Sequence, residues 1–253
     1  MIALAALGAL LIGVCLGLLG SGGSILTVPV LTYLVGQEPK VAIAGSLGVV
    51  SFVSLVGVVP YMLRREVAWS KVLLFGVPGM VGTWTGAFLS KSLSGSVQLT
   101  VFAAVMMFAA FFMLRNGKGA AQTTSASRPK WWIVVAGLLV GVLTGVVGVG
   151  GGFLIVPALV LFGGMPMRLA VGTSLLIIAM QSASGFVKYQ DVLRDQGFAL
   201  DWGVLAVISG IGAAGTFAGS YLSQRMPQQI LRRIFGLLLT CMAAFMLWRT
   251  HVA

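Results

Sequence analysis

The feature that most constrains this chain is a glycine cluster that interrupts a long apolar run and occurs twice. Residues 17–29 read GLLGSGGSILTVP, and residues 145–157 read GVVGVGGGFLIVP, 128 positions later. Glycine adopts backbone angles closed to other residues, and proline removes a backbone hydrogen-bond donor. Inside hydrocarbon such an interruption is tolerated only where it is buried in protein or lines a watery cavity. Matching broken segments in two halves are typical of a transporter's binding site.

The composition around these clusters is that of an integral membrane protein. The 253 residues are 58% hydrophobic and 8% charged, whereas a soluble domain has about 25% charged residues. The apolar runs reach the about 20 residues that a helix needs to cross a bilayer, so we predict an all-α membrane protein. About eight apolar segments are expected, the first and fifth of them broken, at 2–35, 41–63, 72–89, 97–114, 131–162, 169–187, 203–222 and 230–248.

The sequence is an internal repeat. In the first half Gly36, Lys40, Ser46, Ser54 and Tyr61 correspond, 128 positions later, to Gly164, Arg168, Ser174, Ser182 and Tyr189. An insertion around 191–201 then moves the offset to 133, at which GTWTGAFLS (82–90) corresponds to GTFAGSYLS (215–223). We therefore predict a first transmembrane repeat at 1–114, a basic cytoplasmic linker at 115–130 and a second transmembrane repeat at 131–253.

Two topologies fit this repeat. If each broken segment crosses the membrane once, the two halves are parallel. If each folds back as a re-entrant hairpin, each half has three net crossings and the halves are inverted, with both termini outside. A single straight helix over residues 2–35 would be about 50 Å long, against about 30 Å of hydrocarbon. The arms on either side of the glycines suit a re-entrant hairpin, or a bent crossing with a stretched middle. Of the two topologies we favour the hairpin and inverted repeats.

The two glycine clusters are the first candidate site. Successive backbone N–H groups in such a bend form a nest for an anion, and the start of a helix adds the positive end of its dipole. We expect the two bends to meet inside the bilayer around one negatively charged substrate. The alternative is that the glycines only allow close helix packing, as Gly13-xxx-Gly17 and the glycines at 137, 141 and 145 suggest.

Polar residues in the helix after each bend extend this candidate site. Gln181 lies deep in an apolar run, where its amide needs either a substrate or a neighbouring helix as partner. Lys40 and Arg168 are matched cations that serve either as anion entrances or as snorkelling anchors. The predicted substrate-binding residues are Gly20, Ser21, Gly22, Gly23, Ser24, Ser46, Gly148, Gly150, Gly151, Gly152, Ser174 and Gln181.

Several function classes are disfavoured by the residues that the apolar segments lack. The five acidic residues fall in predicted loops and the one histidine, His251, lies at the C-terminal end, so no catalytic base or metal cluster is expected within the segments. We predict no enzyme activity, no cofactor and no metal. The net charge of +11 is explained by basic residues flanking membrane segments, not by a nucleic-acid partner. The expected partners are a small anion and membrane lipid; the coupling ion and the oligomeric state stay open.

The two motifs GLLGSGGSILTVPVL and GVVGVGGGFLIVPALVL resemble those of the TauE/SafE family of membrane proteins, the sulfite exporters. The resemblance covers nearly the whole chain, although Ser24 stands where the second copy has Gly152. It implies a multi-pass transporter of the cell inner membrane that exports sulfite, an organosulfonate or a related sulfur oxyanion as a secondary carrier or facilitator. An anion channel, or uptake instead of export, is the alternative.

Overall fold

The computed structural model describes residues 2–115, 130–148, 152–161 and 164–252, and every regular element within these ranges is a helix. This confirms the all-α prediction. The first half contains α1 (Ile2–Leu19), α2 (Gly22–Pro29), the π-helix η1 (Val30–Leu34), α3 (Pro39–Gly57), α4 (Val59–Leu63), α5 (Trp69–Lys71), the π-helix η2 (Val72–Gly76), α6 (Val77–Leu89), the short 3₁₀ helix η3 (Ser90–Ser92) and α7 (Gly95–Arg115). The second half contains α8 (Lys130–Val147), α9 (Gly152–Leu161), α10 (Met167–Asp195), α11 (Trp202–Arg225) and α12 (Gln228–Val252).

Four continuous helical stretches of the described chain are long and apolar enough to cross a membrane. They are Pro39–Leu63, Trp69–Ser92, Met167–Asp195 and Trp202–Arg225. Large apolar side chains also lie exposed on the outer surface, among them Phe108 at 65% and Leu237 at 62%. In a protein that spans a bilayer such side chains face lipid, where exposure carries no hydrophobic cost.

The first broken segment folds back on itself. Gly20 ends α1 with φ +74°, a conformation that glycine adopts without a Cβ penalty. The chain then returns along α1, because Gly8 lies against Val30 and Gly23 lies against Ile12. In the second half Gly148 takes the matching conformation, φ +69°, between α8 and α9.

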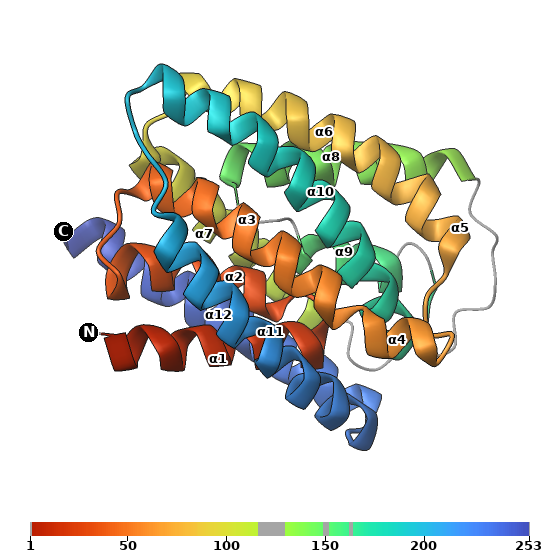
Figure 1. The fold of residues 1–253 in the computed structure, drawn as a ribbon. Coiled ribbons are helices and arrows are strands. Elements are labelled where there is room, and N and C mark those ends of the chain that lie inside the picture. The colour runs from red at the N-terminus through yellow and green to blue at the C-terminus, as the bar shows by residue number, and fades with distance from the viewer. Residues whose placement is uncertain (1, 116–129, 149–151, 162–163, 253) are drawn as a thin grey trace.

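The matched helices α3 and α10 pack side by side in opposite directions (Figure 1). Gly48 lies against Phe186, and the Ser51 hydroxyl donates to the Ala179 carbonyl at 3.1 Å. Beyond the end of α3, Tyr61 of α4 lies against Gly172. The residue number therefore rises along one helix as it falls along the other. This antiparallel pairing supports the prediction of inverted repeats, which stays a prediction until the membrane topology is measured.

Each first helix of a half packs on a helix of the other half, α1 on α11 and α8 on α6. A Cβ on Gly17 would collide with the carbonyl of Thr216, and a Cβ on Gly141 would collide with that of Gly79. The glycines at four-residue spacing thus let the two backbones approach closely, which confirms their predicted packing role.

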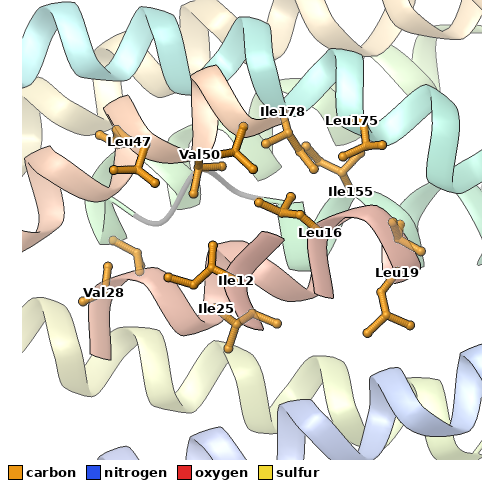
Figure 2. Packing of buried hydrophobic residues seen from close by; sticks show 14 of the residues in the cluster. Ile12, Leu16, Leu19, Ile25, Val28, Leu47, Val50, Ile155, Leu175 and Ile178 are labelled. Carbon is orange, nitrogen blue, oxygen red and sulfur yellow. The ribbon is translucent and has the colours of Figure 1, made fainter. Parts of the chain in front are cut away.

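The centre between the halves is apolar. Four helices contribute fully buried aliphatic side chains to this centre (Figure 2). They are Leu47 and Val50 of α3, Leu175 and Ile178 of α10, Ile25 and Val28 of α2, and Ile155 of α9. The two short second arms, α2 and α9, contact each other in this region. The predicted polar site residues are therefore surrounded by an apolar core.

Candidate functional site

The first elbow (residues 20–24) is held by hydroxyl groups from two helices. Ser174 of α10 donates to the Gly20 carbonyl at 3.1 Å, and also to Val171 in its own helix at 2.8 Å. Tyr61 of α4 donates to the Gly17 carbonyl at 2.6 Å. Two buried carbonyls at the end of α1, those of Gly17 and Gly20, thus have partners where the helix cannot supply them.

The second elbow (residues 148–152) is held in the same way by the corresponding residues. Ser46 of α3 donates to the Gly148 carbonyl at 2.8 Å, and Tyr189 of α10 donates to the Gly145 carbonyl at 3.0 Å. In both elbows the serine comes from the opposite half and the tyrosine from the same half. The structure therefore brings Ser46 to the second elbow and Ser174 to the first. Of the second elbow's predicted residues, Gly150 and Gly151 lie outside the described residues and Gly152 begins α9.

The two elbows lie at opposite ends of the α3–α10 pair. Ser46, at the second elbow, precedes Tyr61, at the first, by 15 residues, which corresponds to about 22 Å along a helix. The expectation that both elbows meet around one anion is therefore wrong for the described residues. Ser21 and Gly23 of the first elbow and Gly148 of the second are buried in protein, and the two elbows are separate from each other.

The first elbow keeps an unused buried hydroxyl. Ser21 is fully buried and its Oγ has no hydrogen-bond partner, whereas the neighbouring Ser24 Oγ donates to the Ser21 carbonyl at 2.7 Å. Gly22 and Gly23 form the first turn of α2, where backbone N–H groups have no partner within the helix and the dipole is positive. Hydroxyl and main-chain donors in one place are the chemistry that an oxyanion requires.

Gln181 lies at the middle of α10, away from both elbows. Its side chain is fully buried, and both the Oε1 and the Nε2 atom lack a hydrogen-bond partner. The amide lies against Gly79 of α6, where a Cβ would collide with it. Ser54 of α3 is likewise fully buried with an unpaired Oγ.

Gln98 is a site residue that the sequence reasoning missed. Its Nε2 atom donates to the Val146 carbonyl at 2.7 Å and to the Tyr189 hydroxyl at 3.0 Å. The corresponding residue in the second half, at the offset of 133, is the buried Leu231. A lone amide inside the apolar run 97–114 was the available signal. The amide ties the second elbow to α7, a link that the first elbow lacks at this position.

The two predicted entrance cations sit in different surroundings. Arg168 donates through Nη2 to the backbone carbonyl of Gln224 at 2.7 Å. The side-chain amide of Gln224, oriented with its oxygen toward Arg64, accepts from that guanidinium. This places two guanidinium groups at the end of the molecule near the first elbow. Lys40 is half-buried beside Gly95 at the other end. Entrance roles for both stay predictions.

Comparison with known proteins agrees with the membrane architecture. The family model described as "Sulfite exporter TauE/SafE" matches residues 5–246. A "probable membrane transporter protein" of Xylella fastidiosa strain 9a5c is 31% identical over 246 residues, covering 95% of this chain and 92% of the relative. Proteins of the same description from Methanocaldococcus jannaschii and Bacillus subtilis are 24% and 25% identical, over 94% and 88% of this chain and 94% and 90% of theirs. No solved structure matches.

Proposed function

Because this chain belongs to the sulfite exporter TauE/SafE family of membrane transporters, we propose that it exports a small sulfur oxyanion, sulfite or an organosulfonate, across the inner membrane. It is a multi-pass membrane protein. The observation that carries the substrate proposal is the first elbow, where the partnerless Ser21 hydroxyl and the positively polarised start of α2 are buried together. A buried donor without a partner is costly, and an oxyanion satisfies several such donors at once.

The elbow serines have a different role from the elbow backbone. A serine hydroxyl has one proton, and in Ser46 and Ser174 that proton is directed to carbonyl oxygens. We therefore assign these two serines to positioning the elbows, and assign substrate contact to the main-chain N–H groups, to Ser21 and to Gln181. With one elbow near each end of the α3–α10 pair, we propose that the anion contacts the two elbows in succession as it crosses.

Export of an anion needs no buried carboxylate or histidine. A cell that is negative inside drives an anion outward by about 2.3 kcal/mol per charge per 100 mV. We propose facilitated export down this potential. An anion channel built from the same elbows is the second candidate, and it predicts unitary currents where a carrier shows saturable counterflow.

The test is sulfite or methanesulfonate flux in proteoliposomes, with Ser21→Ala compared against Ser24→Ala. Loss of a hydrogen bond to a charged group costs roughly 1.5–3 kcal/mol, so Ser21→Ala should raise KM at least roughly tenfold. Ser24→Ala should leave KM within about twofold, because its hydroxyl already bonds the Ser21 carbonyl. Equal, unchanged KM values in both variants would contradict the elbow assignment.

A further inference from the structure

Gln181 is a buried polar side chain whose surroundings the elbows do not explain. It is 0% exposed and has neither donor nor acceptor satisfied. Buried amides in native proteins almost always have a partner, because an unpaired one loses its hydration without compensation. An amide kept in this state at the centre of the longest helix indicates a partner that arrives from outside the chain.

The repeat provides an internal comparison for this position. Gln181 lies against Gly79, and its counterpart Val53 lies against the corresponding glycine, Gly212, where a Cβ would be 3.1 Å from Val53 Cγ2. The same glycine-built space therefore holds an amide in one half and an aliphatic side chain in the other. A valine is enough to fill this space, so packing does not explain why position 181 holds a glutamine.

Neutral hydrogen-bonding groups gather at this level of the molecule. The bond from Ser51 to the Ala179 carbonyl places the adjoining turns of α3 and α10 together, with Ser54 one turn from Ser51 and Gln181 two residues from Ala179. Ser54 is the second unpaired group at this depth. The segments 41–57, 77–89 and 169–187, which surround Gln181, contain no Asp, Glu, Lys, Arg or His.

We propose that Gln181 forms a neutral site midway between the elbows that selects singly charged sulfonate-type oxyanions and rejects doubly charged ones. This inference rests on the proposed function. Removing an ion from water costs energy that rises with the square of its charge, and no cation on these segments compensates a second charge. Neutral donors suffice for one charge spread over several oxygen atoms.

The experiment is radiolabelled uptake into proteoliposomes of methanesulfonate, which carries one charge, and sulfate, which carries two. The wild-type protein should transport methanesulfonate at least tenfold faster than sulfate at equal concentration. Gln181→Val, which copies the residue of the other half, should raise KM for methanesulfonate about tenfold, the effect of one lost hydrogen bond to a charged group. Ser184→Ala is the matched control, since it lies on the same helix with its hydroxyl already bonded to the Met80 carbonyl.

If Gln181→Val does not fold, Gly79→Ala and Gly212→Ala provide a second test of the same site. Gly79→Ala places a methyl group on the amide, and Gly212→Ala places one on Val53, so only the first should raise KM. Unchanged KM in Gln181→Val, or equal effects of the two alanines, overturns the site and assigns the amide to internal water or packing. Equal transport of both anions overturns the selectivity while leaving anion transport intact. Transport of neither anion by the wild-type protein overturns this inference, and absence of sulfite flux as well overturns the proposed function.

Discussion

Single glycines fix the bends, and their surroundings predict different costs for substitution. Gly20 and Gly36 both have positive φ, +74° and +80°, but a Cβ on Gly20 would collide with Val171 and Ser174, whereas nothing lies within 4 Å of a Cβ on Gly36. Gly36→Ala should cost about 1–2 kcal/mol for the backbone conformation alone. Gly20→Ala should cost more, because backbone must also move. Thermal unfolding in detergent measures the stability of both variants. Equal melting temperatures would contradict the close packing of Val171 and Ser174 against Gly20.

The elbow tyrosines make a second comparison at this scale. Tyr61→Phe and Tyr189→Phe each remove a hydroxyl from a glycine carbonyl, and such bonds contribute about 0.6 kcal/mol on average, up to about 1.7, in membrane proteins. Tyr189→Phe should cost more, since it also removes an acceptor from Gln98. A double-mutant cycle with Gln98→Leu, read by thermal unfolding, isolates that coupling. A coupling energy of zero would show that the Gln98 amide does not depend on Tyr189.

Between helices, the glycine contacts predict larger costs of substitution than the side-chain hydrogen bonds do. Gly141→Leu should prevent folding, because even a Cβ at this position collides with the Gly79 carbonyl of α6. Gly210→Leu is the matched control, since nothing lies within 4 Å of a Cβ on that residue of α11. The yield of monodisperse protein in detergent checks both. Recovery of folded Gly141→Leu at the yield of Gly210→Leu would contradict the close α8–α6 approach.

At the level of elements, the pattern of apolar segments predicted the helices well and their partners poorly. The repeat offset located the two bends, and Gly20 and Gly148 do take matching backbone conformations. The sequence could not show that Ser46 and Ser174 each bond to the elbow of the other half. Apolar helix faces toward lipid and toward a neighbouring helix have the same composition, so the pairing of helices cannot be read from it. For the same reason the sequence placed both bends around one anion, when the residues that hold them, Ser46 and Tyr61, lie about 22 Å apart along α3 and α4. Gln98 was missed because a single amide in an apolar run does not show what it contacts.

At the scale of the whole molecule, the described contacts divide the charged residues between two ends. Lys91 and Asp195 form an ion pair at 2.5 Å at one end, and Arg64 and Arg168 both bond to the neutral Gln224 at the other. With the linker cytoplasmic by the excess of basic residues, inverted repeats place Lys91 outside and Arg64 inside.

Cysteine labelling tests this topology. In a background with Cys15 and Cys241 replaced by alanine, an impermeant maleimide should label Lys91→Cys in intact cells and should label Arg64→Cys only after permeabilisation. A C-terminal phosphatase fusion should be active, because that terminus is expected outside. A cytoplasmic C-terminus would contradict the inverted arrangement and favour parallel halves.

The crossed packing of α1 on α11 and of α8 on α6 also bears on how such a chain came to exist. Neither repeat can seat its own broken helix, since the glycine-lined backbone that receives it belongs to the other repeat. A single-repeat polypeptide would therefore need a second copy to supply the receiving helix, and joining two copies in one chain provides it. Two fragments divided between residues 114 and 131 should accordingly reassemble into an active transporter when they are produced together, and neither should accumulate when produced by itself.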